Sequence, residues 1–284
     1  MARHNQVHLF GQVIGVPRFT VNKEGVPNAL FMVNVIRGAR KTKNEIMDVI
    51  QYDSFLVKTA EPEIYEKIRG ISDGDMVDVK GVLTSNNVKK SRICNAAATE
   101  NSLTDSGTCG YKLSSIGTIM FIAPTVLSVW EKGLTTDQGI ALMKERGEIC
   151  NEVVLIGNLT KDPQYYNPST GIYCTTYQIA VDRKYFLKDG KTKDKTDYIY
   201  IRSFGEIARY DHKVLRVGSM VFVEGVLKYK KYVRHDICPN CGAKIEWNDD
   251  SIEVLPYCVE PLKDYITEEE RLAQKIDLAS SVLT

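Results

Sequence analysis

The sequence predicts an all-β protein built from two copies of one small five-stranded barrel. The first observation is an internal repeat, because residues 7–13 (VHLFGQV) are matched about 146 residues later by residues 153–159 (VVLIGNL). The second is another matching pair, residues 76–83 and 220–227, in which a glycine precedes the final Val-Leu. The third is the length of 284 residues, which at about 150 residues per domain accommodates two domains.

Both copies have the same order of elements. Alternating apolar and polar residues predict the second and third strands, and a short helical stretch precedes the fourth strand. Strand, strand, strand, helix, strand, strand is the order of the oligonucleotide-binding (OB) barrel, in which glycine lets the first and fourth strands bend. The predicted second strand, third strand, helix and fifth strand are residues 31–37, 47–55, 61–69 and 118–129 in the first copy, and 177–183, 198–204, 206–214 and 252–259 in the second.

Helices are expected outside the two barrels. Residues 135–146 have the composition of a helical linker, and the sequence TEEE at 267–270 is typical of a capping box that begins a C-terminal helix. The predicted organisation is a first OB-fold domain at 1–130, a helical linker at 131–148, a second OB-fold domain at 149–264 with a zinc-knuckle loop at 235–258, and a C-terminal helical tail at 265–284.

Composition excludes several classes of protein. The chain is 43% hydrophobic and 26% charged, as globular proteins are, and no run reaches the roughly 18 apolar residues of a membrane span. Without an apolar segment near residue 1, we expect a cytoplasmic location and no membrane partner. The net charge of +1 combines a basic segment, with 14 basic and 6 acidic residues in 183–234, and an acidic end, with 3 basic and 10 acidic residues from 246 onward.

Aromatic and basic side chains are interleaved in the second copy. Single-stranded nucleic acid needs positive charge for its phosphates and flat side chains for its unstacked bases, so these residues are candidates for DNA binding. The aromatic candidates are Tyr185, Tyr198, Phe204, Tyr229 and Tyr232, and the basic candidates are Arg183, Lys184, Arg202, Lys228, Lys230 and Lys231. In the first copy, the candidates are Arg37, Arg40 and Lys41 in the corresponding turn.

The first copy has fewer aromatic candidates than the second. When the two copies are superimposed in sequence, Phe55 lies opposite Phe204, whereas Val49 lies opposite Tyr198. We weigh a contribution of the first copy to nucleic-acid binding against a purely architectural or oligomer-forming role.

Four motifs of the second copy belong together: NEVVLIGNLTKDP at 151–163, TDY at 196–198, SFG at 203–205 and VFVEG at 221–225. With them, residues 151–232 resemble the bacterial single-stranded DNA-binding protein (SSB) family, which the first copy resembles only faintly. The resemblance implies that bases stack on Tyr185, Tyr198, Phe204 and Tyr232. It also implies assembly of four barrels, so we expect a homodimer, with a monomer as the alternative. The chain departs from simple bacterial members at its end, which lacks their acidic tip with a terminal phenylalanine.

The second copy also contains a candidate metal site. Cys238 and Cys241 have the spacing of a zinc knuckle, and a closed structural site needs two further ligands. These are His235 and Cys258 from the same copy or, alternatively, Cys94 and Cys109 from the corresponding loop of the first copy. The predicted cofactor is a structural Zn²⁺ that stiffens the loop between the fourth and fifth strands.

No constellation of residues in the sequence indicates catalysis, so we expect a binding protein and not an enzyme. The predicted function is binding and protection of single-stranded DNA, without sequence preference, in replication, recombination or repair. Replication or recombination proteins are the expected protein partners. Two alternatives are an assembly module that loads a helicase or recombinase and a protein that binds single-stranded RNA.

Overall fold

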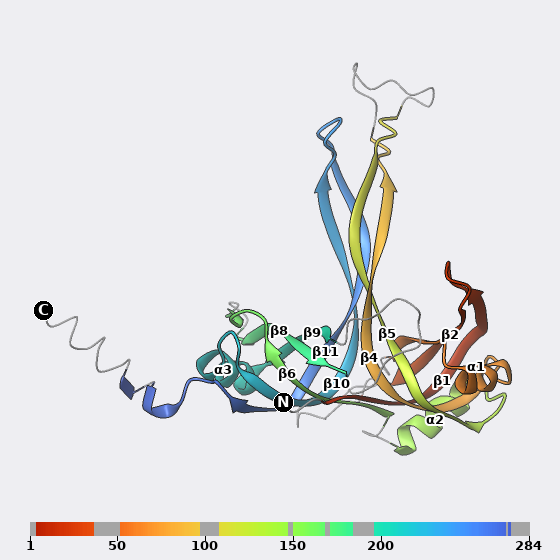
Figure 1. Ribbon diagram of the computed structural model, residues 1–284, viewed down its shortest axis with the longest axis horizontal. Helices are drawn as coiled ribbons and strands as arrows, with labels where there is room; N and C mark the ends of the chain where they lie inside the picture. The colour runs from red at the N-terminus through yellow and green to blue at the C-terminus, as the bar shows by residue number, and fades with distance from the viewer. Residues whose placement is uncertain are drawn as a thin grey trace, which may run out of the picture. The chain divides into compact units, whose positions relative to one another are not determined.

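The computed structural model describes residues 4–36, 52–96, 108–146, 150–167, 171–183, 196–270 and 272–273 (Figure 1). Two compact units make up the protein. The barrel unit comprises Met1–Thr84, Phe121–Lys228 and Glu253–Thr284, and the hairpin unit comprises Ser85–Met120 and Tyr229–Ile252. None of the helices in the described part of the chain is long and apolar enough to cross a membrane.

The first copy forms a closed five-stranded barrel. Its elements are β1 (His4–Val21), β2 (Pro27–Ile36), β3 (Tyr52–Thr59), α1 (Pro62–Arg69), β4 (Met76–Ile93) and β5 (Lys112–Glu131). Strand β1 pairs with both β2 and β4, β2 pairs with β3, and β3 pairs in parallel with β5, which closes the barrel through β4.

The second copy repeats this barrel after the linking helix α2 (Thr136–Arg146). Its elements are β6 (Asn151–Leu159), β7 (Gln164–Tyr166), β8 (Cys174–Asp182), β9 (Thr196–Phe204), α3 (Gly205–Val214), β10 (Met220–Ile237) and β11 (Lys244–Lys263). The pairings β6–β8, β8–β9, β9–β11 and β10–β6 correspond to those of the first copy, and the short β7 adds to the edge of β8. The predicted pair of OB barrels, each with a helix between its third and fourth strands, is confirmed.

Glycine is required where the fourth strand of each barrel crosses the fifth. A Cβ atom on Gly81 would lie 2.3 Å from the carbonyl oxygen of Ala123, and one on Gly225 would lie 2.3 Å from that of Leu255. Both distances are far inside van der Waals contact, so only a residue without a side chain allows this crossing. Because the same contact occurs in both barrels, Ala123 and Leu255 are structural counterparts.

The two barrels join through an antiparallel pairing of β1 with β6, which gives the barrel unit one continuous sheet (Figure 1). Val7 lies opposite Val153, its own counterpart in the repeat. Each first strand is also tied to its fourth strand by an asparagine. Asn5 bonds through its side-chain amide to both backbone groups of Leu83, at 2.8 and 2.9 Å, and Asn151 does the same to Leu227. The repeat is therefore preserved in buried hydrogen bonds as well as in strand order.

The hairpin unit consists of the outer parts of two hairpins, β4–β5 and β10–β11, which lie side by side (Figure 1). Lys90 on the first hairpin forms an ion pair with Asp249 on the second, with 2.5 Å between Nζ and Oδ1. The guanidinium of Arg92 lies 4.6 Å from the ring centroid of Trp247, a cation–π contact. These contacts bind the outer hairpins of the two copies to each other.

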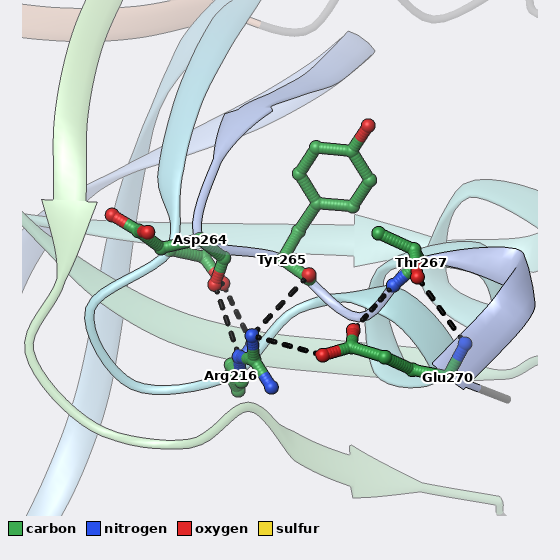
Figure 2. Close-up of polar contacts among 6 residues, drawn as sticks. Arg216, Asp264, Tyr265, Thr267 and Glu270 are labelled. Atoms are coloured by element: carbon green, nitrogen blue, oxygen red, sulfur yellow. Dashed lines mark hydrogen bonds and ion pairs between the residues drawn. The ribbon is translucent and has the colours of Figure 1, made fainter. Parts of the chain in front are cut away.

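The C-terminal helix begins with the predicted capping box. The backbone N–H of Thr267 donates to Glu270 Oε2 at 2.8 Å, and the backbone N–H of Glu270 donates to Thr267 Oγ1 at 3.2 Å (Figure 2). Arg216, in the turn after α3, donates to the carbonyl oxygens of Asp264 and Tyr265 and lies 3.7 Å from Glu270 Oε1. The start of the tail is thus docked on the second barrel, and residues 274–284 of the predicted tail lie outside the described residues.

Among the buried carboxyl groups of the second barrel, Asp211 has a raised pKa. Asp211 of α3 is fully buried and accepts a hydrogen bond of 3.2 Å from the hydroxyl of Tyr177 on β8. Burial raises the pKa of Asp211 from its ordinary 3.8 to about 6, although hydrogen bonds from Ser203 and Tyr177 act in the opposite direction. The ionised form of this side chain therefore destabilises the fold.

We predict that Asp211→Asn stabilises the protein at pH 7 by about 1–3 kcal/mol, because the amide is neutral and can still accept from Tyr177. Since the folded-state pKa is raised, the penalty in the natural protein is absent below about pH 4, develops between pH 4 and 6, and is complete above pH 6. Urea unfolding at pH 4 and pH 7 measures this difference. A stability difference between the variant and the natural protein that is the same at both pH values would contradict the assignment, and Glu269→Gln at an exposed acid is the matched control.

Candidate nucleic-acid interface and cysteine cluster

Strand β9 has one buried face and one exposed face. Ile199, Ile201 and Ser203 point into the barrel and are fully buried. The alternate residues form the outer face of β9, which we define as Tyr198, Tyr200, Arg202 and Phe204. Tyr198, Tyr200 and Phe204 are 53%, 49% and 42% exposed. The structure thus brings two predicted residues, Tyr198 and Phe204, onto one accessible surface.

The neighbouring strand β8 leaves these rings accessible because several of its outward residues are small. Ala180 lies opposite Tyr198, Thr176 lies opposite Arg202, and Cys174 lies opposite Phe204. Tyr200 is an aromatic residue of this face that the sequence prediction omitted. The alternation Tyr-Ile-Tyr-Ile at 198–201 was the signal that could have identified it.

Arg202 is partly neutralised by the protein itself. Its Nε atom lies 2.9 Å from Glu253 Oε2, and the carboxylate side chain is almost completely buried. The charge of Arg202 is therefore shared with Glu253 before any phosphate approaches.

Arg183 does not lie on the outer face, and here the prediction is corrected. Its Nε atom lies 2.8 Å from Asp197 Oδ2, and both side chains are only 2% exposed. Asp197 also accepts a hydrogen bond of 2.7 Å from the hydroxyl of Thr84, on β4 of the first barrel. An arginine that is buried and paired in this way cannot reach a phosphate. Arg183 instead has a structural role, because it holds Asp197, which links the second barrel to Thr84 of the first.

Four further predicted residues lie on the part of β10 that enters the hairpin unit. Successive side chains of a strand alternate, so Tyr229 and Tyr232 are on opposite faces, with Lys231 and Lys230 respectively. Burial raises the pKa of Tyr229, and the nearby carboxylate of Asp250 raises it further. The two tyrosines therefore do not form one aromatic surface. Lys228 is the last residue of β10 that belongs to the barrel unit, and its side chain is half-buried.

Several predicted residues cannot be placed. Those that lie outside the described residues are Lys184, Tyr185, Arg37, Arg40 and Lys41.

The corresponding face of β3 in the first barrel has one aromatic residue, Tyr52, and no aromatic row. The third and fifth strands are parallel in each barrel, with Val57 opposite Ile122 in the first and Ile201 opposite Val254 in the second. Ile122 and Val254 each precede the residue that contacts the crossing glycine, so they are counterparts. Val57 is then the counterpart of Ile201. It follows that the first-barrel residues in place of Tyr198, Tyr200 and Arg202 are Ser54, Leu56 and Lys58.

The sequence superposition of the third strands is therefore wrong. Phe55 is fully buried and takes the place of Ile199, not of Phe204. Leu56 packs against a buried cluster of Val82, Phe121 and Ala123, and the ammonium of Lys58 lies 5.2 Å from the ring centroid of Phe121. An apolar cluster thus occupies the place that exposed rings and an ion pair occupy in the second barrel.

Four cysteines meet in the hairpin unit. The Sγ atoms of Cys94, Cys109, Cys238 and Cys241 all lie within 4.8 Å of one another, and two of the separations, Cys94–Cys241 and Cys109–Cys238, are 3.7 Å. Sulfur atoms at about 2.3 Å from a tetrahedral metal are about 3.8 Å apart, so the cluster has the dimensions of a four-thiolate site.

Backbone hydrogen bonds position these thiols. The N–H of Gly242 donates to the carbonyl of Cys238 and closes a tight turn, whereas the N–H of Gly110 donates to the carbonyl of Cys94, 16 residues earlier, and joins the ends of β4 and β5. Both glycines have positive φ, 71° and 63°, which L side chains rarely adopt. The side-chain amide of Asn240 donates to Cys109 Sγ at 3.3 Å, and this hydrogen bond is the largest of the effects that lower the pKa of Cys109 to about 7.

Of the two candidate sets, the structure brings together the one with Cys94 and Cys109, and it does not bring His235 and Cys258 into the cluster. His235 Nδ1 lies 3.0 Å from Glu246 Oε1 and takes no part in the cysteine group. Cys258 is likewise not a member of this group of four thiols.

Comparison with known proteins identifies the second repeat. Residues 150–238 match the model of the Single-strand binding protein family. The curated single-stranded DNA-binding protein of Xylella fastidiosa is 33% identical over 86 residues, 30% of this chain and 52% of that protein. The one from Clostridium tetani is 38% identical over 87 residues, 30% of this chain and 58% of that protein. The chain thus spans about half the length of these relatives.

Solved structures extend the similarity of fold to nearly the whole chain. A deletion mutant of the single-stranded DNA binding protein from Thermus aquaticus covers 94% of this chain and is itself covered completely, with a TM-score of 0.56 and 17% identity. The wild-type structure covers 93%, with a TM-score of 0.56 and 15% identity. The fold is shared over both barrels, while the resemblance in sequence is confirmed for the second: residues 150–238 carry the pattern of the Single-strand binding protein family.

Proposed function

We propose that this chain binds single-stranded DNA without sequence preference and protects it during replication, recombination or repair. The observation that carries the proposal is the outer face of β9, where Tyr198, Tyr200 and Phe204 stand exposed beside small residues of β8. The relatives that match this barrel are named single-stranded DNA-binding proteins. No catalytic step is part of this function.

Stacking explains why the binding would be insensitive to sequence. Every base has a flat π face, and one base–aromatic contact contributes about 1–3 kcal/mol. Phosphate contacts supply the remaining affinity and make it fall with salt. Of the predicted basic residues that the structure describes in the barrel unit, Arg183 is buried and Arg202 is paired, so Lys228 is the candidate phosphate contact.

The first barrel is proposed to have an architectural role. Its face at Ser54, Leu56 and Lys58 has one ring, Tyr52, in place of the three exposed rings of β9, and its β1 pairs with β6. We also propose that two chains form a homodimer with four barrels, the number that the family resemblance implies. The protein in solution would then have the mass of two chains.

We propose that Cys94, Cys109, Cys238 and Cys241 hold a structural Zn²⁺. Four protein thiolates fill a tetrahedral site and leave no position for a catalytic water. Two of the ligands come from each hairpin, so the metal would supply a cross-link between the outer hairpins of the two copies. The 3.7 Å sulfur separations support this assignment.

The zinc assignment predicts about one zinc per chain in the purified protein. Cys94→Ser removes one of the four thiolates and should abolish stoichiometric zinc, whereas Cys258→Ser should retain it because Cys258 is not part of the four-cysteine cluster. Elemental analysis of the three proteins after dialysis against a weak chelator measures the content. Loss of zinc from Cys258→Ser, or full retention in Cys94→Ser, would contradict this ligand set.

The DNA-binding proposal predicts saturable quenching of fluorescence by poly(dT), with much weaker binding to duplex DNA. Tyr198→Ala should weaken binding about 5- to 150-fold, the equivalent of about 1–3 kcal/mol for one lost stacking contact. Tyr210→Ala, at a 47% exposed tyrosine on α3, is the matched control and should bind as the natural protein does. A natural protein that binds neither poly(dT) nor poly(U) would refute the proposal, and a preference for poly(U) would favour the RNA alternative.

A further inference from the structure

We propose that Tyr200 and Tyr166 are two further base-stacking residues of the second barrel. With Tyr198 and Phe204, they would form one stacking surface across the sheet β7–β8–β9, suited to a single strand in which neighbouring bases are drawn apart. This inference rests on the proposed function and adds residues and a path to it.

Tyr200 is placed for stacking by the pleat of β9. It lies two residues from Tyr198 on the same face, so their Cα atoms are separated by about 6.6 Å, two strand rises. This is about twice the 3.4 Å spacing of stacked bases. Two rings that stand upright at this spacing leave room for one base between them. DNA that uses both tyrosines would therefore be stretched to roughly double the rise of a duplex.

Tyr166 continues the surface onto the next strands. It lies directly opposite Cys174 on β8, and Cys174 lies directly opposite Phe204 on β9. The three residues form one cross-strand row, and residues directly opposite each other in a sheet point to the same face. Tyr166 is 66% exposed, and two strand spacings place it about 9.6 Å from the strand that carries Phe204. Cys174 between them is small and buried, and the guanidinium of Arg202 lies 4.0 Å from its sulfur.

The two neighbouring tyrosines, Tyr165 and Tyr173, are packed against other side chains, unlike Tyr166. Tyr165 stacks on His212 at 4.4 Å and lies 5.9 Å from Tyr173, whose ring is covered by Arg209 at 3.8 Å. These rings pack against α3 and against each other. Tyr166 points to the opposite face of β7, toward the side of Phe204.

The fold itself does not require a tyrosine at position 200. Its counterpart in the first barrel is Leu56, which packs against the apolar cluster at Val82, Phe121 and Ala123. The same barrel therefore closes with an aliphatic side chain at this place. An aromatic ring that is half-exposed and unnecessary for closure is explained by a flat ligand.

The test compares affinities for oligo(dT) at one fixed salt concentration. Tyr200→Ala and Tyr166→Ala should each weaken binding about 5- to 150-fold, whereas Tyr200→Phe keeps the ring and should stay within about 2-fold of the natural protein. Tyr210→Ala controls for loss of an exposed tyrosine outside the surface. Circular dichroism confirms that each variant is folded.

Tryptophan fluorescence at position 200 gives a second measurement. Tyr200→Trp places a larger ring at the same exposed position, and oligo(dT) should quench its fluorescence beyond the change at the natural Trp130 and Trp247. Tyr210→Trp should show no additional quenching.

Different results separate the two proposals. If the natural protein binds oligo(dT) and Tyr198→Ala weakens binding, but Tyr200→Ala and Tyr166→Ala bind as tightly as Tyr210→Ala, the extended surface is refuted and the proposed function stands. If the natural protein does not bind oligo(dT), the proposed function fails and this inference fails with it.

Discussion

A closed barrel of five strands can bury only every second side chain of each strand, and the rest of this molecule follows from that constraint. On β9, the pleat assigns Ile199 and Ile201 to the core and leaves Tyr198 and Tyr200 outside. The core positions must remain apolar for the barrel to close. The outward positions carry no such demand, so they are free to become a surface for ligand.

The two copies show how far the outward positions can differ while closure is kept. Both barrels have the same pairing order, the same glycine crossing and the same asparagine bonds to the fourth strand. At one place, however, the first barrel has Lys58 over Phe121, and the second has Arg202 paired with Glu253. One copy has filled this place with apolar packing, while the other has kept it polar beside exposed rings. Duplication thus allows the division that we propose between an architectural barrel and a binding barrel.

The repeat, the element order and the capping box could be predicted because each depends on residues close together in the chain. The burial of Arg183 could not be predicted, because its partner Asp197 lies on the next strand. A count of basic residues along the chain does not reveal which of them are paired with a carboxylate. The sequence order of preference between the two cysteine groupings failed for a related reason. Cys258 is nearer in sequence to the knuckle than Cys94 is, but strand length carries the loops of β4–β5 and β10–β11 to the same place. The error at Phe55 arose because residues before the third strand differ in length between the copies, so only the strand register fixes the alignment.

Photochemical cross-linking tests the central claim most directly, which is that DNA lies on the outer face of β9 and not on the matching face of β3. Oligo(dT) containing 5-bromodeoxyuridine would be irradiated on the natural protein, and the modified peptides would be identified by mass spectrometry. The account predicts adducts on Tyr198, Tyr200 and Phe204, with no enrichment on the peptide that contains Ser54, Leu56 and Lys58. Equal yields on the two peptides, or adducts confined to the first barrel, would contradict it.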